Sequence, residues 1–134
     1  MLAVTFTIHG KPHAKQRPRF VRATGRTYTP GETVKFEALV GDKARELFKV
    51  PIAGPVKLTV LATFKPPESW SKKKRAEHMG GYHTQKPDSD NLGKSICDGL
   101  NRIAFADDSQ IAEIHCRKMW GENEGTLVMI EALT

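Results

Sequence analysis

Cysteine is scarce in this chain of 134 residues, which contains only Cys97 and Cys116, too few for a disulfide framework. No apolar run approaches the roughly 20 residues that a helix needs to cross a bilayer. The first ten residues have no charged region before their apolar residues, unlike a secretory signal peptide. We therefore expect a cytoplasmic protein that keeps its cysteines as thiols and has no membrane partner.

The sequence also lacks internal repeats and low-complexity segments. Its composition, with 39% hydrophobic and 27% charged residues, is ordinary for a folded protein. We therefore do not expect the whole chain to be disordered. The length suffices for one domain with a modest core. We therefore expect residues 1–134 to form a single domain.

Acidic residues are missing from residues 11–28 and sparse in residues 65–86. The two segments carry +6 and +4, so the remainder of a chain with net charge +6 is about −4. Two segregated basic segments favour a polyanionic partner, most simply nucleic acid, over plain solubilising loops. The residues that we expect to contact DNA in these segments are Lys15, Arg17, Arg19, Arg22, Arg26, Lys72, Lys73, Lys74, Arg75 and Lys86.

Hydrophobic periodicity predicts four strands and two helices. The basic stretch up to Pro30 is expected to be a loop or an irregular hairpin, and residues 65–86 a long polar connection. The order β-α-β-α-β-β predicts an α+β domain with two helices packed on a small mixed sheet. The expected strands are 2–8, 56–64, 110–120 and 126–133, and the expected helices are 31–49 and 91–104.

One stretch, 86-KPDSDNLGKSICDGLNRIAFADDSQI-111, holds two pairs of aspartates in this basic chain. On the expected helix between them, an apolar stripe of Leu92, Ile96, Leu100 and Ile103 would pack inward. The opposite side would present Asp90, Lys94 and Asp98 in a row, with Asn91 alongside. Acidic pairs at a fixed separation in a basic protein suggest a divalent-cation site that faces a polyanion.

Each feature of this stretch also has a structural interpretation. Aspartates at a helix start can cap it, Lys94 and Asp98 can form a simple i, i+4 ion pair, and Asp107 and Asp108 can be turn residues. Taken one at a time, each structural interpretation is the more common one. Together they require too many coincidences in one short stretch.

Other metal sites fit the sequence less well. DSDNLG matches the start of a calcium-binding EF-hand loop, but Leu92 stands where a ligand is required and Gly99 where a bidentate glutamate is required. The histidines and cysteines lack paired zinc-ligand spacings. His115 and Cys116, adjacent on an expected strand, point to opposite faces.

The same stretch resembles the signature of the RusA-type Holliday junction resolvases, a family of phage or prophage endonucleases. That signature runs D-x-D-N, a lysine, D-x-L, and then D-D-x-Q-[IV]. The N-terminal KQRPRF followed by TYTP resembles the longer branch of the family, so the resemblance covers most of the chain. Two departures are a slightly shorter connection before the second aspartate pair and the added basic segment SKKKR.

The resemblance implies a homodimer that acts in DNA recombination and repair. It would use Mg²⁺, with Mn²⁺ as a substitute, to cut four-way DNA junctions by paired, symmetrical incisions. Residue by residue, Asp88, Asp90 and Asp108 match the essential carboxylates of the family, and Lys94 matches its essential lysine. Asp107 is expected at the metal site as well, as a ligand or beside the ligands.

The residue types suit that chemistry. Clustered carboxylates remain ionised only beside a cation, and Mg²⁺ prefers hard oxygen ligands. Lys94 could stabilise the pentacovalent phosphorus or the leaving oxygen, and Asn91 could orient a ligand or reach phosphate. Phe20, Tyr28 and Trp70 lie among the cations and could stack on unpaired bases or simply pack locally.

The sequence is also consistent with two other functions. The first is a metal-dependent nuclease for other branched DNA, such as forks or flaps, because it needs the same basic loops and the same site. The second is a non-catalytic nucleic-acid-binding domain whose acids merely cap a helix.

Overall fold

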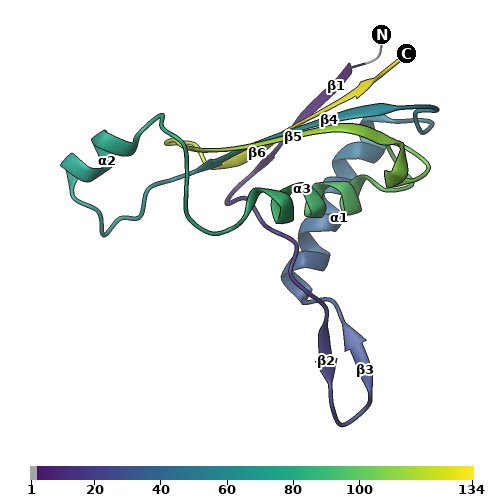
Figure 1. Cartoon of the computed structure of the whole chain (residues 1–134), viewed down its shortest axis with the longest axis horizontal. Helices are drawn as coiled ribbons and strands as arrows, with labels where there is room; N and C mark the ends of the chain where they lie inside the picture. Colours follow the sequence, from purple (N-terminus) through teal and green to yellow (C-terminus); the bar gives the residue numbers. More distant parts are fainter. Residues whose placement is uncertain (1–2) are drawn as a thin grey trace.

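The computed structural model describes residues 3–134 and is built around a four-stranded mixed sheet (Figure 1). The strand order is β1-β6-β4-β5, in which β6 pairs antiparallel with both β1 and β4, and β4 pairs parallel with β5. The predicted α+β class is confirmed, and the four expected strands are present to within one residue at each described end. Leu2, the first residue of the expected strand 2–8, lies outside the described residues. The strand bounds are Ala3–His9 for β1, Val56–Phe64 for β4, Ile111–Trp120 for β5 and Gly125–Ala132 for β6.

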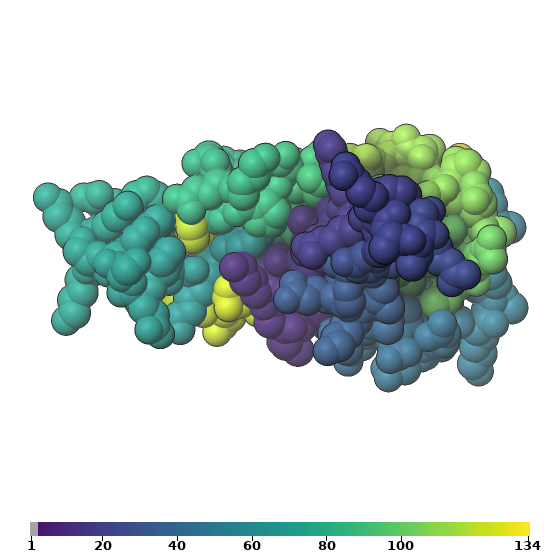
Figure 2. Space-filling view, turned by 90° about the horizontal axis from the view of Figure 1, so that it is seen from below, coloured from purple at the N-terminus to yellow at the C-terminus, as the bar shows by residue number. Residues whose placement is uncertain are grey.

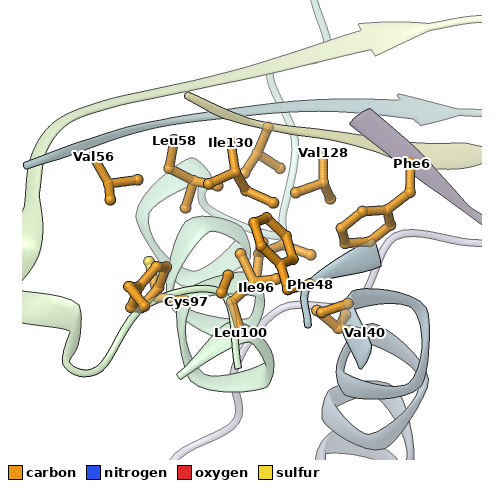
Figure 3. Packing of buried hydrophobic residues seen from close by; sticks show 14 of the residues in the cluster. Phe6, Val40, Phe48, Val56, Leu58, Ile96, Cys97, Leu100, Val128 and Ile130 are labelled. Carbon is orange, nitrogen blue, oxygen red and sulfur yellow. The ribbon is translucent and has the colours of Figure 1, made fainter. Parts of the chain in front are cut away.

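Helices α1 (Gly31–Leu47) and α3 (Ser89–Leu100) pack on one face of this sheet (Figure 1). Strand β4 alternates buried and half-buried residues along its whole length, so its buried side supplies the floor of the core. Figure 3 shows side chains from both helices meeting it, including Val40, Ile96 and Leu100. Among the described residues 3–134, no helix packs on the opposite face of the sheet (Figure 1).

The two helices approach one another closely at Gly99. A Cβ atom at this position would lie 2.7 Å from Cβ of Val40 on α1, closer than real Cβ contacts allow. Glycine therefore permits the crossing that holds α3 against α1. Helix α3 then ends at Leu100, because Asn101 leaves the helical conformation and Arg102 is left-handed with a φ of 68°. The predicted extension of this helix to residue 104 is wrong, and Ile103 follows the helix.

Three regular elements lie in two segments, one predicted as a loop or an irregular hairpin and the other as a polar connection. The basic stretch before Pro30 forms a two-stranded hairpin of β2 (Arg19–Val21) and β3 (Arg26–Tyr28), which extends away from the sheet (Figure 1). The polar connection contains helix α2 (Lys72–His78), capped by the Ser71 hydroxyl, which accepts a hydrogen bond from the Lys74 N–H. No residue of α2 is buried, so the sequence contains no apolar repeat from which this helix could be predicted.

The segment that follows α2 is anchored by aromatic packing. His83 is buried, stacks on Phe64 with ring centroids 4.1 Å apart, and packs against Trp120 at 4.4 Å. Its Nδ1 has no hydrogen-bond partner among residues 3–134. Burial lowers the pKa of His83, and the charge of Lys118 adds to this effect.

The depressed pKa of His83 predicts a loss of stability in acid. The unfolded chain takes up a proton near the ordinary histidine pKa, about 6.5, before the folded protein does. The contribution of neutral His83 is therefore fully present above about pH 6.5 and decreases as the pH falls below that value. We expect His83→Phe to flatten the fall in unfolding temperature between pH 7 and pH 5, measured by circular dichroism. Equal pH dependence in both proteins would contradict this assignment.

Candidate active site

The first turn of α3 presents two exposed carboxylates. Asp88 occupies the N-cap position, but its side chain makes no capping hydrogen bond and instead lies 3.0 Å from Nζ of Lys86. Oδ1 of Asp90 accepts a hydrogen bond only from the adjacent Asn91 N–H, at 2.9 Å. Helix capping therefore does not account for Asp88, and both carboxylates are open to solvent and to ligands.

Farther along the same face of α3, Asp98 forms ion pairs with two lysines. Its Oδ1 lies 3.4 Å from Nζ of Lys94, and its Oδ2 lies 3.1 Å from Nζ of Lys15. Lys15 also pairs with Glu37 on α1 at 2.5 Å. Burial by itself would lower the pKa of Lys15, but its hydrogen bonds to Glu37 and Asp98 outweigh that effect and raise the pKa. The predicted pair of Lys94 and Asp98 is thus part of a four-residue network.

The loop before the hairpin is fixed to both helices. The Lys15 N–H donates to the Asn91 carbonyl at 2.9 Å, and the Ser95 hydroxyl donates to the His13 carbonyl at 2.7 Å. On the α1 side, the Thr33 hydroxyl bonds the Gln16 side chain at 3.0 Å. A groove of about 520 Å³ therefore lies between this loop and α3. Its lining residues are Lys15, Gln16, Arg17, Pro18, Asp90, Asn91, Lys94 and Asp98.

The two residues of the second aspartate pair, Asp107 and Asp108, have different roles. Asp107 caps the short 3-10 helix η1 (Asp108–Gln110) by accepting a hydrogen bond from the Ser109 N–H at 3.0 Å, which lowers its pKa. The Gln110 side chain completes this cap and reaches the carbonyls of Ile52 and Gly54. Asp107 thus has the turn-forming role that the sequence left open, whereas Asp108 is half-buried and starts the 3-10 helix.

Within one chain, Asp88 and Asp90 lie at the start of α3, whereas Asp107 and Asp108 lie beyond its end, at the start of η1. The charge of Asp90 contributes to a raised pKa of Cys116, and that of Asp108 to the raised pKa of Cys97, although burial is the main cause for both thiols. Among residues 3–134, no group of three or more histidines, cysteines, aspartates or glutamates is close enough to hold a metal ion. The assignment of Asp88, Asp90, Asp107 and Asp108 as metal ligands stays a prediction, supported by the hard oxygen donors that they offer.

Most of the predicted DNA-contacting residues fall on two projections of the molecule, whereas Lys15 and Asn91 line the groove and Lys86 pairs with Asp88. Arg17, Arg19, Arg22 and Arg26 are exposed on or beside the hairpin. Phe20 and Tyr28, exposed by 64% and 48%, accompany them. Figure 2, which views the molecule from below, shows the hairpin in dark blue and the segment with α2 in teal at separate places, with green residues that lead into α3 between them.

The segment that contains α2 presents exposed cations, but its tryptophan, Trp70, packs against other side chains. Lys72, Lys73 and Lys74 are exposed, and Arg75 donates a hydrogen bond to the Pro67 carbonyl at 3.0 Å. Trp70 packs against Trp120 and His78, with Nζ of Lys74 4.3 Å above its ring centroid. Local packing is therefore the correct interpretation of Trp70.

The ion pairs of Lys15 predict a structural role for this residue. Lys15→Met removes both pairs and leaves the half-buried Glu37 and Asp98 without this cation. We expect a loss of roughly 1–3 kcal/mol in the free energy of unfolding, measured by urea denaturation at pH 7. The control, Arg17→Met, changes an exposed residue of the same loop and should stay within about 0.5 kcal/mol of wild type. Equal losses in the two variants would contradict the structural role.

Comparison with known proteins identifies the family of this chain. The family model described as endodeoxyribonuclease RusA matches residues 9–131, a range that includes the groove, both aspartate pairs and both basic projections. An uncharacterized protein of Bacillus subtilis strain 168, YqaN, is 33% identical over 143 residues, covering 100% of this chain and 99% of its own length. Among residues 3–134, no helix is long and apolar enough to cross a membrane. The chain belongs to the RusA endodeoxyribonuclease family.

Proposed function

We propose that this protein is a Mg²⁺-dependent endonuclease that resolves four-way DNA junctions by paired, symmetrical incisions in DNA recombination and repair. The RusA family supports a nuclease that acts on junction DNA. The observation that carries the proposal for this chain is the groove beside α3, in which Asp90, Asn91 and Lys94 lie together in a protein of net charge +6. This combination suits a cation and a phosphate at one place.

Asp88, Asp90 and Asp108 are the proposed metal ligands, and Mn²⁺ is expected to substitute for Mg²⁺. When bound, such a cation lowers the pKa of an attacking water and neutralises charge on the phosphoryl oxygens. Asp107 supports the site indirectly, because its cap holds the turn from which Asp108 projects. Asn91, exposed on the first turn of α3, can orient a ligand or donate to phosphate.

Lys94 is the proposed cation for the transition state. Asp98 holds its ammonium at 3.4 Å, but more than half of the Lys94 side chain remains exposed, so it can reach a phosphate in the groove. There it would meet negative charge that develops on phosphoryl or leaving oxygens. Lys15, paired with Glu37 and Asp98, keeps Asp98 in place from the other side.

The two basic projections are proposed to hold the arms of the junction. Phosphate contacts give affinity and register without reading bases. The exposed rings of Phe20 and Tyr28 on the hairpin are available to stack on bases that are unpaired at a crossover. Since one site makes one cut, two symmetrical cuts on a two-fold substrate require two chains, and we propose a C₂ homodimer.

A nuclease for forks or flaps is the second candidate, because the same groove and projections would serve these substrates. Cleavage of a synthetic four-way junction, compared with fork and flap DNA at equal concentration and with Mg²⁺, distinguishes the two. Faster cleavage of forks or flaps than of the junction would overturn the resolvase assignment while leaving the nuclease assignment intact.

Asp90→Asn removes one proposed ligand without changing the size of the side chain. Losing a ligand beside the reacting phosphate should reduce single-turnover cleavage of a four-way junction in Mg²⁺ by about 100-fold or more. Binding in Ca²⁺, measured by gel shift, should be unchanged or tighter, because a charge that repels phosphate is gone. The control is Glu32→Gln, an exposed acid in the first turn of α1, which should cut like wild type. Wild-type cleavage by Asp90→Asn would remove it from the ligand set.

Lys94→Ala separates catalysis from binding on the same helix. The fold should tolerate it, since Lys94 is exposed and alanine is the best helix former. Single-turnover cleavage should fall by roughly 100-fold, whereas junction affinity in Ca²⁺ should fall little because many other cations remain. Equal losses in both assays would make Lys94 a phosphate anchor. No loss in either assay would leave it only as the ion-pair partner of Asp98.

A further inference from the structure

Lys118 on β5 binds the segment that leads into α3. Its carbonyl accepts a hydrogen bond from the His83 N–H at 3.0 Å. Its ammonium donates to the Gln85 carbonyl at 2.6 Å and to the Pro87 carbonyl at 2.7 Å. One residue of the sheet therefore holds three alternate residues of this segment, and the last of them directly precedes Asp88.

The place of Lys118 in the sheet explains these contacts. Lys118 pairs in register with Ala62, a buried residue of β4, and so its side chain points to the face on which the helices pack. Its backbone lies where residues 80–83 run along the end of β5, and Tyr82 forms a bridge with Met119 there. The segment from α2 thus passes the end of β5 before it enters α3 (Figure 1).

The ammonium of Lys118 is bound by backbone oxygens and has no acidic partner. Among residues 3–134, no carboxylate lies within ion-pair distance of it. Lys118 is half-buried, so the water that its charge loses must be replaced by other acceptors. The carbonyls of Gln85 and Pro87 supply two of them, which ties the position of these residues to the charge of Lys118.

The charge of Lys118 acts in the same region as that of Asp90. Burial raises the pKa of the Cys116 thiol, the charge of Lys118 lowers this pKa, and the charge of Asp90 raises it. A positive charge close to a cation site repels the cation, so the charge of Lys118 does not by itself favour metal binding. What Lys118 contributes to this region is the position of the segment that its ammonium binds.

Asp88 depends on its backbone for its position. Its side chain makes no capping hydrogen bond, and its ion pair with Lys86 joins two exposed side chains, so this pair contributes little. On one side, the Asp88 carbonyl accepts the Leu92 N–H of α3 at 3.2 Å. On the other side, the preceding residue, Pro87, is held by Lys118. The carboxylate is therefore placed by α3 and by Lys118 together.

We propose that Lys118 is a positioning residue for the metal site, which holds residues 85–87 so that the carboxylate of Asp88 stays beside that of Asp90. The inference rests on the proposed function, which makes these two aspartates ligands of Mg²⁺. Lys118 acts through Asp88 and is itself assigned to neither metal nor phosphate. Residues that orient metal ligands in this way change metal affinity or activity by about 10- to 100-fold when they are replaced.

The magnesium dependence of cleavage tests this role. Lys118→Met keeps an unbranched side chain but removes both hydrogen bonds to the carbonyls. The Mg²⁺ concentration for half-maximal single-turnover cleavage of a four-way junction should therefore rise by about tenfold or more. Loss of the charge alone would lower this concentration, because a cation beside the site repels Mg²⁺. Lys118→Arg keeps a cation with N–H donors and should stay within about threefold of wild type.

The matched control is Arg117→Met, which removes a cation from the adjacent residue of β5. Arg117 is exposed and pairs with Leu61, a residue of β4 that does not face the core, so it points to the other face of the sheet. This variant should keep the magnesium dependence of wild type. Junction affinity in EDTA, measured by gel shift, should be alike in wild type, Lys118→Met and Arg117→Met, because each variant loses one of many cations.

Backbone dynamics test the same contacts without metal or DNA. In NMR relaxation measurements on the metal-free chain, the amides of residues 84–86 should have order parameters of about 0.8 in wild type and below about 0.6 in Lys118→Met. The amide of Ile96, buried in the middle of α3, should stay rigid in both proteins and shows that the fold is intact. Arg117→Met should give the values of wild type throughout.

A Lys118→Met protein that needs no more Mg²⁺ than wild type, or whose residues 84–86 stay rigid, would overturn the positioning role. A selective loss of junction affinity in EDTA would overturn it too and make Lys118 a phosphate contact. A wild-type chain that cuts no branched DNA would overturn the proposed function instead. In that case the order parameters still decide whether Lys118 holds the segment before Asp88.

Discussion

The burial of one stripe of α3 against β4 and β5 fixes the direction of every polar side chain on that helix. Leu92, Ile96 and Leu100 are almost completely buried, and each contributes roughly 2 kcal/mol of hydrophobic stabilisation. With this stripe inward, Asp90, Lys94 and Asp98 must point outward, because helical geometry places them on the other side. Gly99 lets α1 approach, so the helix cannot rotate without a clash with Val40.

Some cations of the protein stabilise its fold, and others are exposed and available to bind phosphate. Lys15 is half-buried and joins α1 to α3 through its ion pairs with Glu37 and Asp98. The arginines of the hairpin and the lysines of α2 are exposed and project from the body on separate elements. Exposed cations are the ones that release counterions when they meet phosphate. The two projections therefore offer binding energy, while Lys15 maintains the groove between them.

The sheet has an open edge strand beside the helix that carries the groove. Its helices cover one face, which leaves β5 as an open edge close to α3. An open edge is an aggregation risk unless charges, a cover or a specific partner protects it. Residues 80–83 cover one end of β5, where the His83 N–H donates to the Lys118 carbonyl and the Trp120 N–H donates to the Gly81 carbonyl.

The sequence alone determined the features that depend on local periodicity. The alternation of β4, the inward stripe of α3 and the outward row of Asp90, Lys94 and Asp98 all follow from side-chain repeats of two or 3.6 residues. The family motif likewise lies in one continuous stretch. These features could be predicted from the sequence because the residues that define them are neighbours along the chain.

Tertiary structure decided what depends on contacts between distant residues. The pairing of Lys15 with Glu37 and Asp98, the bond from Ser95 to the His13 carbonyl and the packing of Trp70 on Trp120 join segments far apart in sequence. Helix α2 has no buried face, so only its cap and its neighbours define it. Asp88 and Asp107 look alike in sequence, yet one carboxylate is open and the other caps a turn. The physical reason is that hydrogen bonds and packing select one role for each side chain only after the whole chain has folded.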